Sequence, residues 1–379
     1  MKTARVPDVI RHANTGVMKQ LLNLGQSVWL DDLQRRTTRS GKLQTMVRDG
    51  LRGVTSNPTI FEHGLTRGRD YDAEISKRVT AGDSDQDILE AIMVDDIQEA
   101  ADVLRPVYDE TDGADGFVSI EVTPNIARDT EATIYEARRL WYTVGRPNVM
   151  VKIPGTREGW PAIERCLTEG ININITLLFS LEHYRAVAEA YLQALETRVA
   201  QGRAIDHLAS VASIFVSRVD TEADRRIAEH GTALTHLCGH VAVANARLIY
   251  AEYLRLVRTP RWHALATKGA RVQRVLWAST GTKNPAYSDV LYVESLIGED
   301  TITTVPPETL RLFEDHGTVR TTLPGDASAA AQIMDALESA DIRFAEVNET
   351  LEREGIEKFV KSHESVLRAI REKRNARGH

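Results

Sequence analysis

The chain has 379 residues, of which 42% are hydrophobic and 27% are charged, and its formal net charge is −7. This composition is typical of a globular protein with a large core, and it excludes a disordered or fibrous chain. An acidic chain without a large basic face is not expected to bind nucleic acid, and its two cysteines indicate neither a disulfide framework nor a zinc site.

Residues 1–25 precede the first strand candidate, and we expect them to form a helical extension. They contain no apolar core of the kind that a signal peptide has. No later segment approaches the roughly 18 uninterrupted apolar residues of a membrane span. The sequence therefore predicts a cytoplasmic protein that has no contact with a membrane.

Eight short apolar runs follow one another along the chain, and most of them end in polar residues or alternate with them. The clearest alternation places the isoleucines of 171–175 between Asn172, Asn174 and Thr176, which at a period of two gives one apolar and one polar face. The eight runs cover residues 28–32, 53–58, 116–122, 148–155, 171–176, 211–218, 274–280 and 301–305. We interpret all eight as β-strands.

The segments between and after these strands have the apolar spacing of helices. The spacing is helical over residues 70–112, 127–143, 181–200 and 221–257, of which the last is long enough for two helices. Beyond the eighth strand, Asp326 is expected to cap a helix, and residues 343–375 predict a long charged helix. We expect the C-terminal helices, from about residue 326 to residue 379, to pack on the outside of the strands or to close one end of them partly.

Eight strands that alternate with helices predict a parallel sheet. The chain length of 379 residues favours a closed (β/α)8 barrel over an open sheet, and we expect the barrel to form a single domain over 1–379. Active sites of such barrels lie at the C-terminal ends of the strands, where polar residues far apart in sequence meet at one mouth. An ordinary barrel core would favour Val, Ile or Leu at inward positions, so polar residues there indicate a site. The residues expected at the mouth are Asp31, Asn57, Glu121, Lys152, Asn174, Ser213 and Arg218.

Lys152 lies in the middle of the apolar strand 148–155. Burial disfavours the charged form of an amine, and the neutral amine is a nucleophile that forms a Schiff base with a carbonyl substrate. For this strand taken by itself, the alternative is a lysine at the strand edge whose ammonium extends into solvent.

Residues 255–274 form a locally basic stretch in an otherwise acidic chain. One such stretch indicates a solvated surface or a site for a small anion, because nucleic-acid binding requires a larger basic face.

Six motifs, each at a strand end, are together highly specific. They are SVWLDDL (27–33), VTSNPTIF (54–61), VSIEVTP (118–124), VKIPGT (151–156), NINITLLFS (172–180) and ASTGTKN (278–284). In these motifs and their order the chain resembles transaldolases of the longer bacterial type, over residues 26–317, which are class I Schiff-base aldolases. The resemblance implies a barrel enzyme that needs no cofactor. Its reaction, in the non-oxidative pentose phosphate pathway, transfers a dihydroxyacetone unit from sedoheptulose 7-phosphate to glyceraldehyde 3-phosphate, giving erythrose 4-phosphate and fructose 6-phosphate.

The resemblance also implies the catalytic roles. Lys152 corresponds to the Schiff-base lysine, Asp31 to the general base at the C4 hydroxyl, and Glu121 to the carboxyl that acts through water in forming and hydrolysing the imine. Asp32 remains an alternative to Asp31, because strand alternation puts the two on opposite faces and periodicity does not choose between them. Glu121 has the alternative role of an ion-pair partner that keeps Lys152 charged.

The remaining expected site residues bind the substrate. Asn57, Asn174 and Thr176 are expected to position the substrate hydroxyls and the catalytic water, although Asn174 and Thr176 are also explained as ordinary interior hydrogen bonds. The resemblance implies that Ser213 contacts the substrate.

The resemblance places the substrate phosphate on Arg218 and on the turn after the seventh strand, which contains Ser279 and Lys283. Lys283 stands where the shorter relatives have a second phosphate-binding arginine, and Ser56 stands where many relatives have threonine.

Three other functions remain open at this point. A lyase of the fructose-6-phosphate aldolase type would use the same lysine but release free dihydroxyacetone. A sugar-phosphate isomerase would form no Schiff base, and a barrel that only binds a partner would catalyse nothing. The expected partners are the four sugar phosphates of the transaldolase reaction, and a homodimer is one of the expected assemblies.

Overall fold

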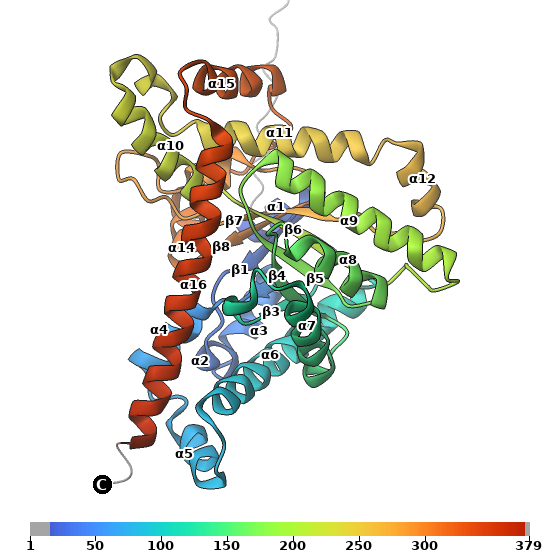
Figure 1. The fold of residues 1–379 in the computed structure, drawn as a ribbon, viewed down its shortest axis with the longest axis vertical. Helices are drawn as coiled ribbons and strands as arrows, with labels where there is room; N and C mark the ends of the chain where they lie inside the picture. The colour runs from blue at the N-terminus through green and yellow to red at the C-terminus, as the bar shows by residue number, and fades with distance from the viewer. Residues whose placement is uncertain (1–15, 376–379) are drawn as a thin grey trace, which may run out of the picture.

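The computed structural model describes residues 16–375, and a closed barrel of eight parallel strands forms its centre (Figure 1). Each strand pairs with the next along the chain, and β1 pairs with β8. The strands are β1 (Gln26–Leu30), β2 (Leu51–Thr55), β3 (Phe117–Glu121), β4 (Val149–Pro154), β5 (Ile173–Leu178), β6 (Ser210–Phe215), β7 (Arg274–Ala278) and β8 (Thr301–Val305). The predicted (β/α)8 barrel and its eight strands are confirmed.

Helices surround the barrel and continue beyond its last strand. The α-helices are α1 (Val17–Asn23), α2 (Arg35–Arg39), α3 (Lys42–Asp49), α4 (Pro58–Arg67), α5 (Asp72–Ala81), α6 (Asp85–Glu110), α7 (Thr130–Val144), α8 (Gly159–Glu169), α9 (Leu181–Ala200), α10 (Ser217–His230), α11 (Val241–Leu256), α12 (Pro260–Ala266), α13 (Leu291–Ser295), α14 (Pro307–His316), α15 (Ala327–Ser339) and α16 (Phe344–Asn375). Two short 3₁₀ helices, η1 (Pro124–Ile126) and η2 (Thr232–Leu237), complete the set for the described part of the chain.

The helical segment predicted over 70–112 is two helices, α5 and α6. Gly82 ends α5 with a φ of +87°, a left-handed conformation that residues other than glycine rarely adopt. Ser84 then begins α6, and its hydroxyl accepts the backbone N–H of Asp87 at 3.1 Å. The segment 221–257 is divided in the same way into α10 and α11, by Gly231 and η2.

The N-terminal end of the barrel is closed by a buried polar network around Asp115, which directly precedes β3. Its carboxylate accepts hydrogen bonds from the indole Nε1 of Trp29 at 2.9 Å and from the hydroxyl of Ser27, and Arg274 at the start of β7 donates to Ser27 at 2.7 Å. Gly53 of β2 faces Trp29 so closely that a Cβ atom there would lie 2.4 Å from the indole ring. These side chains therefore fill this end of the barrel.

The C-terminal helices were expected on the outside of the strands or over one end. Figure 1 shows α16 as one long helix that runs from α15 and α10, past the barrel, to α4 and α5. Asp326 caps α15 as predicted, accepting the backbone N–H groups of Ser328 and Ala329. Of the predicted N-terminal extension, residues 1–15 lie outside the described residues, and α1 occupies most of the rest. A single domain over the whole chain stays a prediction.

Within residues 16–375, no helix has both the length and the apolar character that crossing a membrane requires.

Replacing Arg35 should destabilise the protein far more than replacing Arg39, although both lie on α2 and both pair with a carboxylate of α6; Arg35 also pairs with Glu74 of α5. Arg35 is buried, with its Nε 2.6 Å from Asp96, which also accepts the hydroxyl of Tyr71 at 2.7 Å, whereas the pair of Arg39 and Glu99 is largely exposed. Burial raises the pKa of Asp96 to about 6. Removal of Arg35 leaves a buried carboxyl without its charged partner.

We expect Arg35→Ala to lower the free energy of unfolding by about 3–5 kcal/mol. Arg39→Ala should lower it by no more than about 1 kcal/mol. Urea unfolding of the two variants and the parent checks this, and equal losses would contradict the role of burial.

Candidate active site

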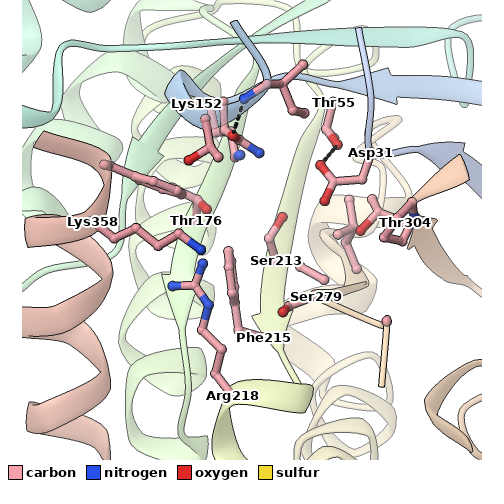
Figure 2. A pocket seen from close by; sticks show the side chains of 18 of the residues that line it. Asp31, Thr55, Lys152, Thr176, Ser213, Phe215, Arg218, Ser279, Thr304 and Lys358 are labelled. Atoms are coloured by element: carbon pink, nitrogen blue, oxygen red, sulfur yellow. Dashed lines mark hydrogen bonds between the residues drawn. The ribbon is translucent and has the colours of Figure 1, made fainter. Parts of the chain in front are cut away.

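A cavity of about 200 Å³ opens at the C-terminal ends of the barrel strands (Figure 2). Most of the residues predicted for the site line it, and they are Asp31, Asn57, Lys152, Thr176, Ser213, Arg218, Ser279 and Lys283. Glu121 and Asn174 do not line it. They flank Lys152 instead, because β3, β4 and β5 pair Glu121 with Lys152 and Lys152 with Asn174. The barrel register thus brings together three polar residues from three separate strands.

The side chain of Lys152 is buried at the base of the cavity, with only 5% of the residue exposed. Its Nζ lies 3.2 Å from Oε2 of Glu121 and donates to the backbone carbonyl of Ser56 at 3.2 Å. The amine therefore points into the barrel, and the alternative of a strand-edge lysine that reaches solvent does not fit. An amine so placed meets a carbonyl compound that enters the cavity.

Glu121 is as deeply buried as the lysine beside it. Burial raises the pKa of Glu121, and the ammonium of Lys152 counteracts this only in part. A carboxyl in this environment takes up and releases a proton closer to neutral pH than an exposed one, which suits it to proton transfer at the neighbouring nitrogen.

The two neighbouring aspartates after β1 have different surroundings. Asp31 lines the cavity and accepts the hydroxyl of Thr55 at 2.9 Å (Figure 2). Asp32 does not line the cavity, and its carboxylate accepts the side-chain amide of Gln34 at 3.2 Å. The structure therefore brings Asp31, and not Asp32, to the mouth.

The amide and hydroxyl side chains divide into two groups. Asn174 is held inside the barrel, because it donates to Ser119 at 3.0 Å and accepts the hydroxyl of Ser213 at 2.7 Å. Asn57 uses its Oδ1 to cap α4, accepting the backbone N–H of Ile60 at 3.1 Å. The hydroxyl of Thr176, in contrast, is buried at the cavity wall without a hydrogen-bond partner among the described residues. Thr176 is thus available to a ligand or water.

Cationic side chains line the outer part of the cavity. Arg218 lies in the first turn of α10, with its guanidinium 5.0 Å from the ring centroid of Phe215, and Lys283 follows β7. Ser279, in the turn after β7, has a φ of +57°, and its hydroxyl lies 2.9 Å from that of Ser217.

Two lining residues that the sequence did not indicate, Lys358 and Phe359, come from α16. Sequence alone shows that this helix is charged and long. It does not show which turn of the helix meets the barrel.

The basic stretch 255–274 does not contribute to the cavity. Arg255 pairs with Glu252 at 2.7 Å, and Arg261 pairs with Glu196 at 2.7 Å. Arg274 belongs to the polar network at the opposite end of the barrel. Each of these arginines is paired with a carboxylate, within α11 for Arg255 and elsewhere in the chain for Arg261 and Arg274, which disfavours an anion site.

Within the described part of the chain, no group of three or more His, Cys, Asp or Glu residues is arranged to hold a metal ion.

Known proteins resemble this chain over nearly its whole length. Residues 28–370 match the family described as transaldolase/fructose-6-phosphate aldolase. The transaldolase of Trichodesmium erythraeum is 46% identical over 371 residues, covering 95% of this chain and 98% of the relative. The transaldolase of Thermobifida fusca is 50% identical over 353 residues, with 92% and 96% covered, and that of Mycobacterium bovis is 45% identical over 351 residues, with 92% and 94% covered.

Proposed function

The chain belongs to the transaldolase family, and we propose that its barrel cavity transfers a dihydroxyacetone unit from sedoheptulose 7-phosphate to glyceraldehyde 3-phosphate. The products are erythrose 4-phosphate and fructose 6-phosphate, in the non-oxidative pentose phosphate pathway. The observation that carries the proposal is the buried amine of Lys152 beside Glu121, with Asp31 lining the same cavity. This arrangement supplies a nucleophile, an acid and a base for cleavage next to a carbonyl group.

Lys152 opens the reaction. Its neutral amine attacks C2 of the ketose, and loss of water from the resulting carbinolamine gives a protonated imine. Glu121, 3.2 Å from the lysine nitrogen, supplies the proton that leaves with this water and takes one back when the imine is hydrolysed. Thr176, whose buried hydroxyl has no hydrogen-bond partner within residues 16–375, holds the water that is released and later consumed.

Asp31 performs the cleavage step. It removes the proton of the C4 hydroxyl, the C3–C4 bond breaks, and the bonding electrons move into the imine to form an enamine. The aldehyde leaves, a second aldehyde takes its place, and the same steps in reverse form the new bond. The hydrogen bond from Thr55 fixes one oxygen of Asp31 and leaves the other for the substrate.

Arg218 and Lys283 bind the substrate phosphate at the outer part of the cavity. A guanidinium offers two parallel donors to a phosphate, and the packing of Arg218 on Phe215 limits its motion before the substrate arrives. Asn57 and Ser213 bind sugar hydroxyls, whereas Asn174 orients Ser213 from behind. A reaction without a cofactor, a homodimer and a cytoplasmic location stay predictions from the sequence.

Release of glyceraldehyde 3-phosphate from fructose 6-phosphate should depend on an added acceptor. We expect release beyond one equivalent per active site only when erythrose 4-phosphate is present, because after one cleavage the enamine on Lys152 waits for an aldehyde. A coupled assay with and without the acceptor measures this. Equal release without the acceptor would assign the fructose-6-phosphate aldolase reaction instead, and no release in either case would refute both.

A further inference from the structure

The C-terminal helix α16 contributes directly to the wall of the cavity. Phe359 is buried, and its ring centroid lies 6.0 Å from Nζ of Lys152 and 6.0 Å from Cζ of Arg218. One turn earlier, Gly355 approaches the end of β5 so closely that a Cβ atom would lie 2.9 Å from Leu177. The part of α16 around these residues is therefore held against the barrel at a defined position.

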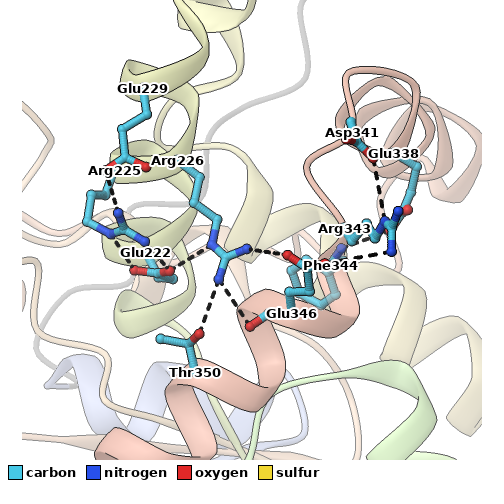
Figure 3. Close-up of polar contacts among 10 residues, drawn as sticks. All are labelled: Glu222, Arg225, Arg226, Glu229, Glu338, Asp341, Arg343, Phe344, Glu346 and Thr350. Atoms are coloured by element: carbon cyan, nitrogen blue, oxygen red, sulfur yellow. Dashed lines mark hydrogen bonds and ion pairs between the residues drawn. The ribbon is translucent and has the colours of Figure 1, made fainter.

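A second set of contacts fixes the beginning of α16 to α10 (Figure 3). Arg226 of α10 donates to the side chain and to the backbone carbonyl of Glu346, each at 3.2 Å, and to the hydroxyl of Thr350 at 3.1 Å. Glu222 orients Arg226 by accepting its Nε at 2.7 Å. Because α10 also carries Arg218, these contacts tie α16 to the helix that presents the phosphate-binding arginine.

Lys358 extends from α16 toward Arg218 at the rim of the cavity, and Figure 2 shows the two cationic groups facing each other. Lys283 lines the same part of the cavity from the turn after β7. In residues 16–375, none of these three cations forms an ion pair with a carboxylate. Burial lowers the pKa of Lys358, the charges of Arg218 and Lys283 lower it further, and the carboxylate of Glu62 offsets this only in part. Cations gathered in this way repel one another unless an anion lies between them.

We propose that Lys358 is the third cation of the phosphate site, supplied by the C-terminal helix, and that it makes the enzyme select phosphorylated over unphosphorylated sugars. The inference rests on the proposed function. A phosphate with two negative charges offers three outer oxygens, so cations from three elements, α10, α16 and the turn after β7, can each bind one.

The test is the binding of inorganic phosphate, measured by calorimetry without turnover. Lys358→Met keeps the aliphatic stem and removes the charge, and we expect it to weaken phosphate binding about tenfold. Lys358→Arg should restore most of the affinity. Lys361→Met is the matched control, because Lys361 is an exposed cation of the same helix that does not line the cavity. It should bind phosphate like the parent.

Kinetics give a second readout for the same variants. Lys358→Met should raise the KM for fructose 6-phosphate more than it lowers kcat, and it should leave the KM for unphosphorylated fructose unchanged. Phosphate affinity equal to that of the parent, or an equal loss in Lys361→Met, would overturn the inference. Arg218→Ala separates this failure from that of the proposed function. Suppose that the parent catalyses transfer, that Arg218→Ala binds phosphate weakly and that Lys358→Met binds it normally. That result refutes the role of Lys358 and leaves the proposed function standing.

Discussion

Replacement of Lys152 by methionine will abolish transfer and leave the fold intact. Methionine fills a volume close to that of the lysine stem but has no nucleophile, so neither the carbinolamine nor the imine forms. The carboxyl of Glu121 loses its partner, and because burial already raises the pKa of Glu121, it adapts by taking up a proton. The variant should therefore remain folded with a protonated glutamate in place of the ion pair.

Borohydride reduction in the presence of fructose 6-phosphate measures this most directly. The parent should be trapped as a covalent adduct on residue 152, detected by mass spectrometry of the peptide, and Lys152→Met should show no adduct anywhere in the chain. Lys361→Met, outside the cavity, serves as the control that remains trappable. Transfer activity retained by Lys152→Met, or an adduct on another lysine of the parent, would refute the Schiff-base mechanism.

Asp31→Asn should reduce turnover by about 10²–10⁴-fold, because it removes the base that accepts the C4 hydroxyl proton. The asparagine oxygen can still accept the hydroxyl of Thr55, so the geometry of the site should persist. Imine formation does not require this base, and borohydride should still trap the substrate on Lys152. The variant would then bind the ketose covalently but cleave it slowly.

Asp32→Asn is the matched control for this experiment. Asp32 contacts Gln34 and does not line the cavity, so its replacement should change turnover only a few-fold. Steady-state turnover and trapping measured in parallel distinguish the two residues. A larger loss of turnover in Asp32→Asn than in Asp31→Asn would reverse the assignment of the base.

The fold was predictable because the barrel strands carry a strong local signal. The isoleucines of 171–175 alternate with Asn172 and Asn174, and a period of two is hard to satisfy with a helix. The location of the candidate site was predictable from the polar residues at the strand ends, because a parallel barrel brings its C-terminal strand ends together. Lys152, the lysine in the apolar run 148–155, is buried as the sequence predicts, and it lines the cavity.

Other features depend on packing that no local pattern encodes. Periodicity separates Asp31 from Asp32 but does not tell which face of β1 points inward, and that is settled only when Thr55 of the neighbouring strand meets Asp31. The segment 70–112 is divided into two helices at Gly82 and Ser84. A turn residue and a capping residue occupy only a few positions, so the longer helical pattern on either side conceals the break. Lys358 reaches the cavity from a helix far along the chain, so its role follows from how α16 packs across the mouth.

The position of α16 also sets an order of events in biosynthesis. All eight strands precede α16 in the chain, so a ribosome completes the barrel, including Lys152, Glu121 and Asp31, before it adds Phe359. Domains generally fold as units, so the cavity gains its α16 wall only after residues 344–375 have been made and pack against the barrel. Until then the cavity lacks the side formed by Phe359, whose ring lies 6.0 Å from the amine of Lys152.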